Sequence, residues 1–79
     1  MNISDNIYLT SDLYLTAYLK VKGFKFTVEK IKSKSNFIFE STPNLLIHVN
    51  EYLSENGSCE PLAFTNAIKN LKNYLYNNK

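Results

Sequence analysis

The sequence has little of several features that define common protein classes. It contains a single cysteine, Cys59, so no internal disulfide can form, as is usual in a reducing compartment. It lacks an uninterrupted apolar run of about 18 residues, so no membrane span is expected. Its first residues, 1–5, are polar and acidic, unlike the basic and then apolar start of a secretory leader. These absences predict a cytoplasmic protein.

Arginine is also absent, and all nine basic residues are lysines. Bidentate guanidinium contacts to guanine or phosphate are therefore excluded, and any nucleic-acid contact has to use ammonium groups. The only glycines are Gly23 and Gly57, so the chain has no glycine-rich loop for binding phosphates.

The chain is short, at 79 residues, of which 44% are hydrophobic. That length predicts one domain over residues 1–79, with a flexible arm at 1–7 and a frayed tail at 77–79. A domain of this size buries only about 60% of its unfolded surface, so it can hold a core or a roomy pocket, but hardly both. This argues against a large cofactor and against most enzymes.

The first periodic segment predicts a helix from Asp12 to Lys22, with Ser11 as N-cap and Gly23 just after the last turn. Its apolar residues are Leu13, Tyr14, Leu15, Ala17, Tyr18, Leu19 and Val21. They surround most of the helix, so we expect it to be covered by a sheet on one side and by other helices or a second subunit on the other.

After Gly23 the period changes to two, which predicts a β-hairpin. Its phenylalanines, which we expect to face the helices, are Phe24, Phe26, Phe37 and Phe39. Ile31 interrupts the alternation, so either a bulge lies at Glu29-Lys30 or the strand ends and restarts. The turn is expected at residues 33–36, and residues 7–9 are expected to form an edge strand.

Two further helices follow the hairpin. Ser41-Thr42-Pro43 is typical of a helix start, and Asn56-Gly57 is expected to end that helix. Pro61 begins the last helix. The order helix, hairpin, helix, helix predicts a single small α+β domain with the hairpin packed against the helices.

Several segments carry a family resemblance. Residues 8–19, followed by Lys22-Gly23-Phe24, resemble a family of small bacterial and phage proteins known as domain of unknown function 5659. The resemblance continues through residues 36–40 and 61–64 and covers about residues 8–76. It implies no activity and no functional residues, only a context in phages and mobile elements. The chain departs from the pattern at Glu60, where a capping aspartate is typical.

The most basic segment spans residues 20–34, with six lysines against one glutamate. The candidate contact residues are Lys25, Lys30, Lys32 and Lys34. Such lysines can neutralise phosphates without reading sequence, or contact an acidic protein surface. They can also form a solvated strand face that discourages edge-to-edge aggregation.

Six tyrosines are a second unusual feature. Four of them, Tyr14, Tyr18, Tyr52 and Tyr74, fall on apolar faces and are expected in the core. Tyr8 and Tyr76 lie outside the periodic patterns. They are either exposed, in which case they are a candidate protein interface, or partly buried in the ordinary way.

No catalytic, metal or cofactor site is predicted. His48 is expected on a polar helix face with Glu51 and Glu55, which offer too few ligands for zinc. Cys59 is the only cysteine, and apart from His48 the sequence has no histidine, so no general base is evident that would activate its thiol.

These observations predict a small non-catalytic binding protein of phage or mobile-element type that occupies a surface on a larger protein. An inhibitor of a nucleic-acid-targeting defence system would suit its size. The alternative is a nucleic-acid-binding module that uses the lysine-bearing hairpin, and homodimerisation is compatible with either hypothesis.

Overall fold

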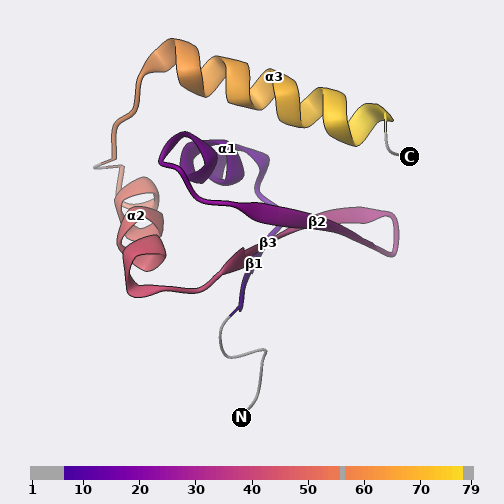
Figure 1. The fold of residues 1–79 in the computed structure, drawn as a ribbon, viewed down its shortest axis with the longest axis horizontal. Helices are drawn as coiled ribbons and strands as arrows, with labels where there is room; N and C mark the ends of the chain where they lie inside the picture. The colour runs from indigo at the N-terminus through magenta and orange to yellow at the C-terminus, as the bar shows by residue number, and fades with distance from the viewer. Residues whose placement is uncertain (1–6, 56, 78–79) are drawn as a thin grey trace.

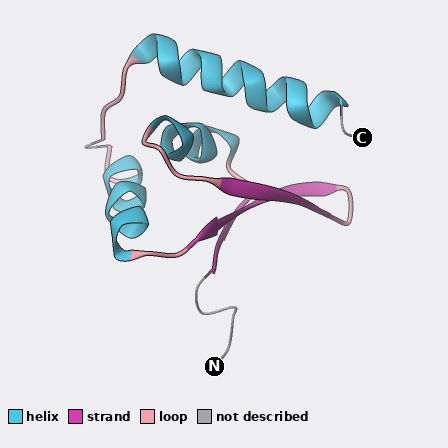
Figure 2. Cartoon of the chain, in the orientation of Figure 1, coloured by secondary structure: helices cyan, strands magenta, loops and turns pink. Residues whose placement is uncertain are grey.

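The computed structural model describes residues 7–55 and 57–77 (Figure 1). In order, its elements are β1 (Ile7–Thr10), α1 (Leu13–Val21), β2 (Phe26–Ile31), β3 (Lys34–Glu40), α2 (Pro43–Leu53) and α3 (Pro61–Asn77). Strands and helices pack together as one α+β unit, which confirms the predicted class (Figure 2). Most of the expected arm lies outside the described residues, but Ile7 already belongs to β1. Of the expected tail, Asn77 ends α3, and residues 78–79 lie outside the described residues. No helix in the described ranges is long and apolar enough to cross a membrane.

The sheet is antiparallel, with strand order β1-β3-β2, so the predicted edge strand and hairpin are both confirmed. Phe39 pairs with Tyr8 on one side and with Phe26 on the other, which places these three side chains on the same face. Phe37 and Phe39 on this face are almost completely buried. The helices therefore cover this inner face, while the outer face carries Ile7 and Leu9.

The hairpin turn consists of Lys32 and Ser33, not of residues 33–36 as predicted. Both residues have positive φ, 50° and 70°, as a type I′ turn requires. The bulge or restart expected near Glu29-Lys30 is also wrong, because β2 pairs with β3 without interruption from Phe26 to Ile31. The position of the turn was predicted wrongly because type I′ turns usually contain asparagine and glycine, and Lys32-Ser33 has neither.

α1 begins one residue later than predicted, with Asp12 rather than Ser11 as N-cap. The Asp12 carboxylate accepts hydrogen bonds from the N–H groups of Tyr14 (3.0 Å) and Leu15 (3.2 Å). A carboxylate also interacts favourably with the positive end of the helix dipole. Gly23, with φ 99°, follows the last turn as expected.

α1 is the centre of the core. Residues 15–19 are all buried, which requires cover on every side because they span more than one helical turn. α2 and α3 pack against α1, and the inner face of the sheet supplies the remaining cover (Figure 1). α1 was expected to be covered either by other helices of the chain or by a second subunit. The helices of the same chain provide this cover.

α2 begins at the predicted Thr42-Pro43, where the Thr42 hydroxyl accepts the Leu45 N–H at 3.1 Å. It ends at Leu53, and the left-handed residue after it is Glu55 (φ 63°), not Gly57. Gly57 has a different role, because a Cβ at this position would collide with the Tyr18 hydroxyl.

α3 begins at the predicted Pro61. The Glu60 carboxylate accepts the Ala63 N–H at 2.7 Å and so caps the first turn of the helix.

Candidate functional site

A groove between β2 and α3 has apolar walls and polar ends. Phe26 and Val28 form its β2 side, Leu71 and Tyr74 its α3 side, and Lys20 of α1 one end. Its volume is about 520 Å³. A smaller hollow of about 120 Å³, lined by Val28, Lys30, Ser35, Tyr74 and Leu75, shares two of these residues and continues toward the hairpin turn.

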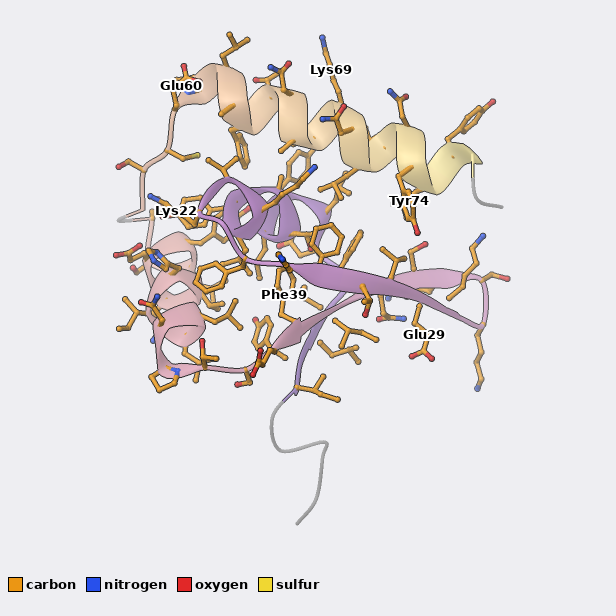
Figure 3. The ribbon with its side chains drawn as sticks, viewed as in Figure 1. Lys22, Glu29, Phe39, Glu60, Lys69 and Tyr74 are labelled. Carbon is orange, nitrogen blue, oxygen red and sulfur yellow. The ribbon has the colours of Figure 1, made fainter. Side chains whose placement is uncertain are left out.

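The groove exists because α3 is longer than α1. At 1.5 Å per residue, the 17 residues of α3 span about 25 Å, whereas the nine of α1 span about 14 Å. The C-terminal half of α3 therefore extends beyond α1 and lies over the hairpin without a helix beneath it (Figure 1). Tyr74, half exposed at 50%, points from this part of α3 toward β2 (Figure 3).

The groove is positively charged at both ends. Lys20 lines one end and Lys30 the other, and both are exposed. Among the described residues, no aspartate or glutamate lines either hollow. An anionic ligand would therefore be attracted to it.

The four candidate lysines of the hairpin do not form one patch. The pairing places Lys30 on the inner side of the sheet, beside Ser35, while Lys25 and Lys34 lie on the outer side at opposite ends of β2. Glu29 lies between them on the outer side. Lys32 lies in the turn. Only Lys30 of the four lines the groove.

The two candidate tyrosines, Tyr8 and Tyr76, differ in how far they are buried. Tyr8 is half-buried and packs against the core beside Phe39, so of the two candidates only Tyr76 is well exposed. Tyr76, near the end of α3, is 71% exposed. Of the four tyrosines expected in the core, Tyr18 is buried and Tyr52 half-buried, whereas Tyr14 and Tyr74 are about half exposed.

A polar cluster around Tyr18 was not predicted. The Tyr18 hydroxyl donates to Glu51 Oε1 at 3.3 Å, and His48 Nδ1 lies 2.9 Å from the same oxygen. The His48 ring packs edge-on against Phe24, and Lys22 Nζ lies 5.3 Å from the centre of the Tyr18 ring. His48 is thus half-buried, and its expected place on a solvated face is wrong. The Phe24 ring covers part of His48. The expectation that Phe24 faces the helices was the only sequence signal for this contact.

Burial raises the pKa of the Tyr18 phenol, and the negative charge and hydrogen bond of Glu51 raise it further. Burial also raises the pKa of Tyr52, whose ring centre lies 5.4 Å from that of Tyr18. A phenol that stays neutral and donates to a carboxylate stabilises the fold and is a poor base. Across the described residues, no three histidine, cysteine, aspartate or glutamate side chains lie close enough together to hold a metal ion.

The outer face of the sheet is a second feature that the sequence did not indicate. Ile7 and Leu9 are 42% and 51% exposed, and Ile38 pairs with Leu9 on the same face. Lys25 and Glu40 border this apolar row. No helix covers it within the described residues.

The fold and groove define a small α+β domain with one apolar, basic-ended groove beside an edge strand. The chain belongs to the family described as Domain of unknown function (DUF5659), whose model matches residues 5–77. This confirms the resemblance noted in the sequence over nearly the whole chain. No curated protein and no solved structure matches it.

Proposed function

We propose that this is a small non-catalytic binding protein that regulates a larger protein by holding a segment of it in the groove between β2 and α3. The observation that supports this most is the groove itself: apolar walls, lysines at both ends and one half-exposed tyrosine. Apolar centres with polar rims and tyrosine are typical of protein interfaces.

This mode of action suits a regulator or inhibitor made by a phage or mobile element and acting in the cytoplasm, including an inhibitor of a nucleic-acid-targeting defence system. The genes beside the coding sequence would test that context. Genes of such a defence system or of a virion beside it would support the context, and metabolic genes alone would contradict it.

Site-specific photo-cross-linking tests the binding surface. Benzoylphenylalanine is introduced at position 74, inside the groove, and in a matched variant at position 69, where the lysine points away from the sheet (Figure 3). We expect nuclease-resistant protein adducts from position 74 in the native host and few from position 69. Equal adducts from both positions, or none from position 74, would contradict the proposal.

The competing function is nucleic-acid binding through Lys25, Lys30, Lys32 and Lys34. It is tested by binding of short DNA and RNA at low and high salt, because phosphate contacts through lysine weaken steeply with salt. Binding at physiological salt that is lost when all four lysines become glutamate would favour it over the proposal. We expect no such binding, because the sheet separates these lysines.

A further inference from the structure

We propose that the segment held in the groove is extended and acidic, and that it adds as a strand to the free edge of β2. This inference rests on the proposed function and specifies its partner. Three observations support it: the unpaired edge, the position of the groove along that edge, and the charges at its ends.

The outer edge of β2 is available for pairing. β2 pairs with β3 on one side and has no strand on the other within the described residues. In a two-residue hairpin the pair that flanks the turn, Ile31 and Lys34, is of the hydrogen-bonded type. Alternation along the ladder then directs the main-chain N–H and C=O groups of Phe26, Val28 and Lys30 away from β3. An edge of this kind is a template for strand addition.

The groove runs along this same edge. Phe26, Val28 and Lys30, whose main chains face outward, also line the two hollows with their side chains. Thr27 also lines the larger hollow. Because its side chain points to the other face of the sheet, its main chain must reach the hollow. The edge of β2 therefore lies at the groove. A strand that pairs with β2 would therefore place every second side chain against Leu71 and Tyr74 of α3.

The charges select an acidic ligand. Lys20 and Lys30 border the groove at opposite ends, and no acidic side chain of residues 7–55 or 57–77 lines it. A strand with apolar residues toward the groove and carboxylates near its ends would neutralise both lysines. A basic strand would leave them unpaired and repelled.

Capped synthetic peptides test the inference. The probe is one residue longer than β2. It has glutamate at both ends, valine at the third and fifth positions and threonine between them, so that the glutamates and valines share the face toward the groove. The matched peptide has lysine in place of glutamate. We expect the glutamate peptide to bind in calorimetry and the lysine peptide to bind at least about tenfold more weakly. Equal affinity, or no binding of the glutamate peptide, would overturn the acidic specificity.

N-methylation of the peptide tests the strand pairing without altering the protein. Methyl groups are placed on the main-chain nitrogens of one alternate set of residues or of the other. Only one set donates toward β2, so we expect one methylated peptide to lose binding and the other to retain it. Equal effects of the two sets would rule out strand addition.

A pair of protein variants tests the same hydrogen bonds from the other side. Lys30→Ala and Lys30→Pro both remove the ammonium group, but only proline also removes the outward N–H. Proline is tolerated in an edge strand when its nitrogen faces outward. We expect Lys30→Pro to bind the glutamate peptide about tenfold more weakly than Lys30→Ala, with unchanged circular dichroism. Similar affinities in two folded variants would contradict the inference.

The charge at the other end is tested by Lys20→Glu against Lys69→Glu, which changes net charge equally outside the groove. We expect about tenfold weaker binding only for Lys20→Glu. Cross-links from position 74 combined with failure of the peptides would refute this inference alone. Peptide binding without such cross-links would refute the proposed function.

Discussion

Tyr18 links three segments of the chain. Its ring packs against the tilted ring of Tyr52, and its hydroxyl donates to Glu51 of α2. The loop before α3 passes so close that a Cβ at position 57 would collide with the Tyr18 side chain. The sequence pattern predicted that Tyr18 is buried but not what its hydroxyl contacts, because the partner lies 33 positions away. Periodicity reports which side of a helix is buried and carries no information on long-range polar pairs.

Gly57→Ala should destabilise the protein by about 1–3 kcal/mol, because the added Cβ forces the packed Tyr18 ring to move. Urea unfolding measures the change. In the Tyr18→Phe background the same substitution should cost less, since the nearest atom is gone. An equal cost in both backgrounds would contradict the assigned contact.

Stability should fall at high pH because of Tyr18 and Tyr52. Both have pKa values raised above the ordinary value of 10.0, so the folded state holds these protons more tightly than the unfolded state. Their stabilising contribution is complete below pH 10.0 and is lost as pH rises from there through the folded-state pKa. Unfolding free energies measured on both sides of pH 10.0 check this.

The control for this pH effect is the double variant Tyr18→Phe, Tyr52→Phe. It should show a smaller loss of stability above pH 10.0 than the unchanged protein. The same loss in both proteins would show that other groups cause it.

The elements were predictable where a local rule determines them. Pro43 and Pro61 begin helices, Gly23 follows one, and alternating phenylalanines form the hairpin, all as the patterns indicate. The exact turn was not predictable, because Lys32 and Ser33 adopt positive φ only under the constraint of the paired strands.

Ser33→Gly should therefore raise the free energy of unfolding by about 0.5–1 kcal/mol, since glycine adopts φ 70° without the steric cost of a Cβ. Thermal or urea unfolding provides the measurement. The matched Ser35→Gly, within β3, should instead lower it by about 0.5–1 kcal/mol. A loss of stability in both variants would contradict the turn.

The groove was not predictable from local patterns at all. It arises from the different lengths of α1 and α3 and from the position of α3 above the hairpin, which depend on the packing of the whole chain. The candidate lysines were identified as basic, but the register of the sheet decides that Lys30 lines the groove while Lys25 and Lys34 do not. Lys20, which also lines the groove, belongs to α1 and not to the hairpin.

The whole molecule offers a surface for self-association other than the one first expected. The apolar helix α1 is covered within one chain, whereas the exposed Ile7 and Leu9 and the partly exposed Ile38 form an apolar row on the outer sheet face. A stable interface needs about 800 Å² per partner, more than this short row supplies. Light scattering should therefore give the monomer mass of 9.1 kDa. A dimeric mass that Leu9→Lys abolishes would show instead that two copies meet through this face.

The most direct test of the groove as the binding surface is an NMR titration of the labelled protein with the glutamate peptide. We predict that the amide shifts change along β2 and the C-terminal half of α3, and that the amides of Phe26, Val28 and Lys30 gain protection from exchange. Changes confined to β1 and the outer-face residues Leu9 and Ile38 would contradict the account.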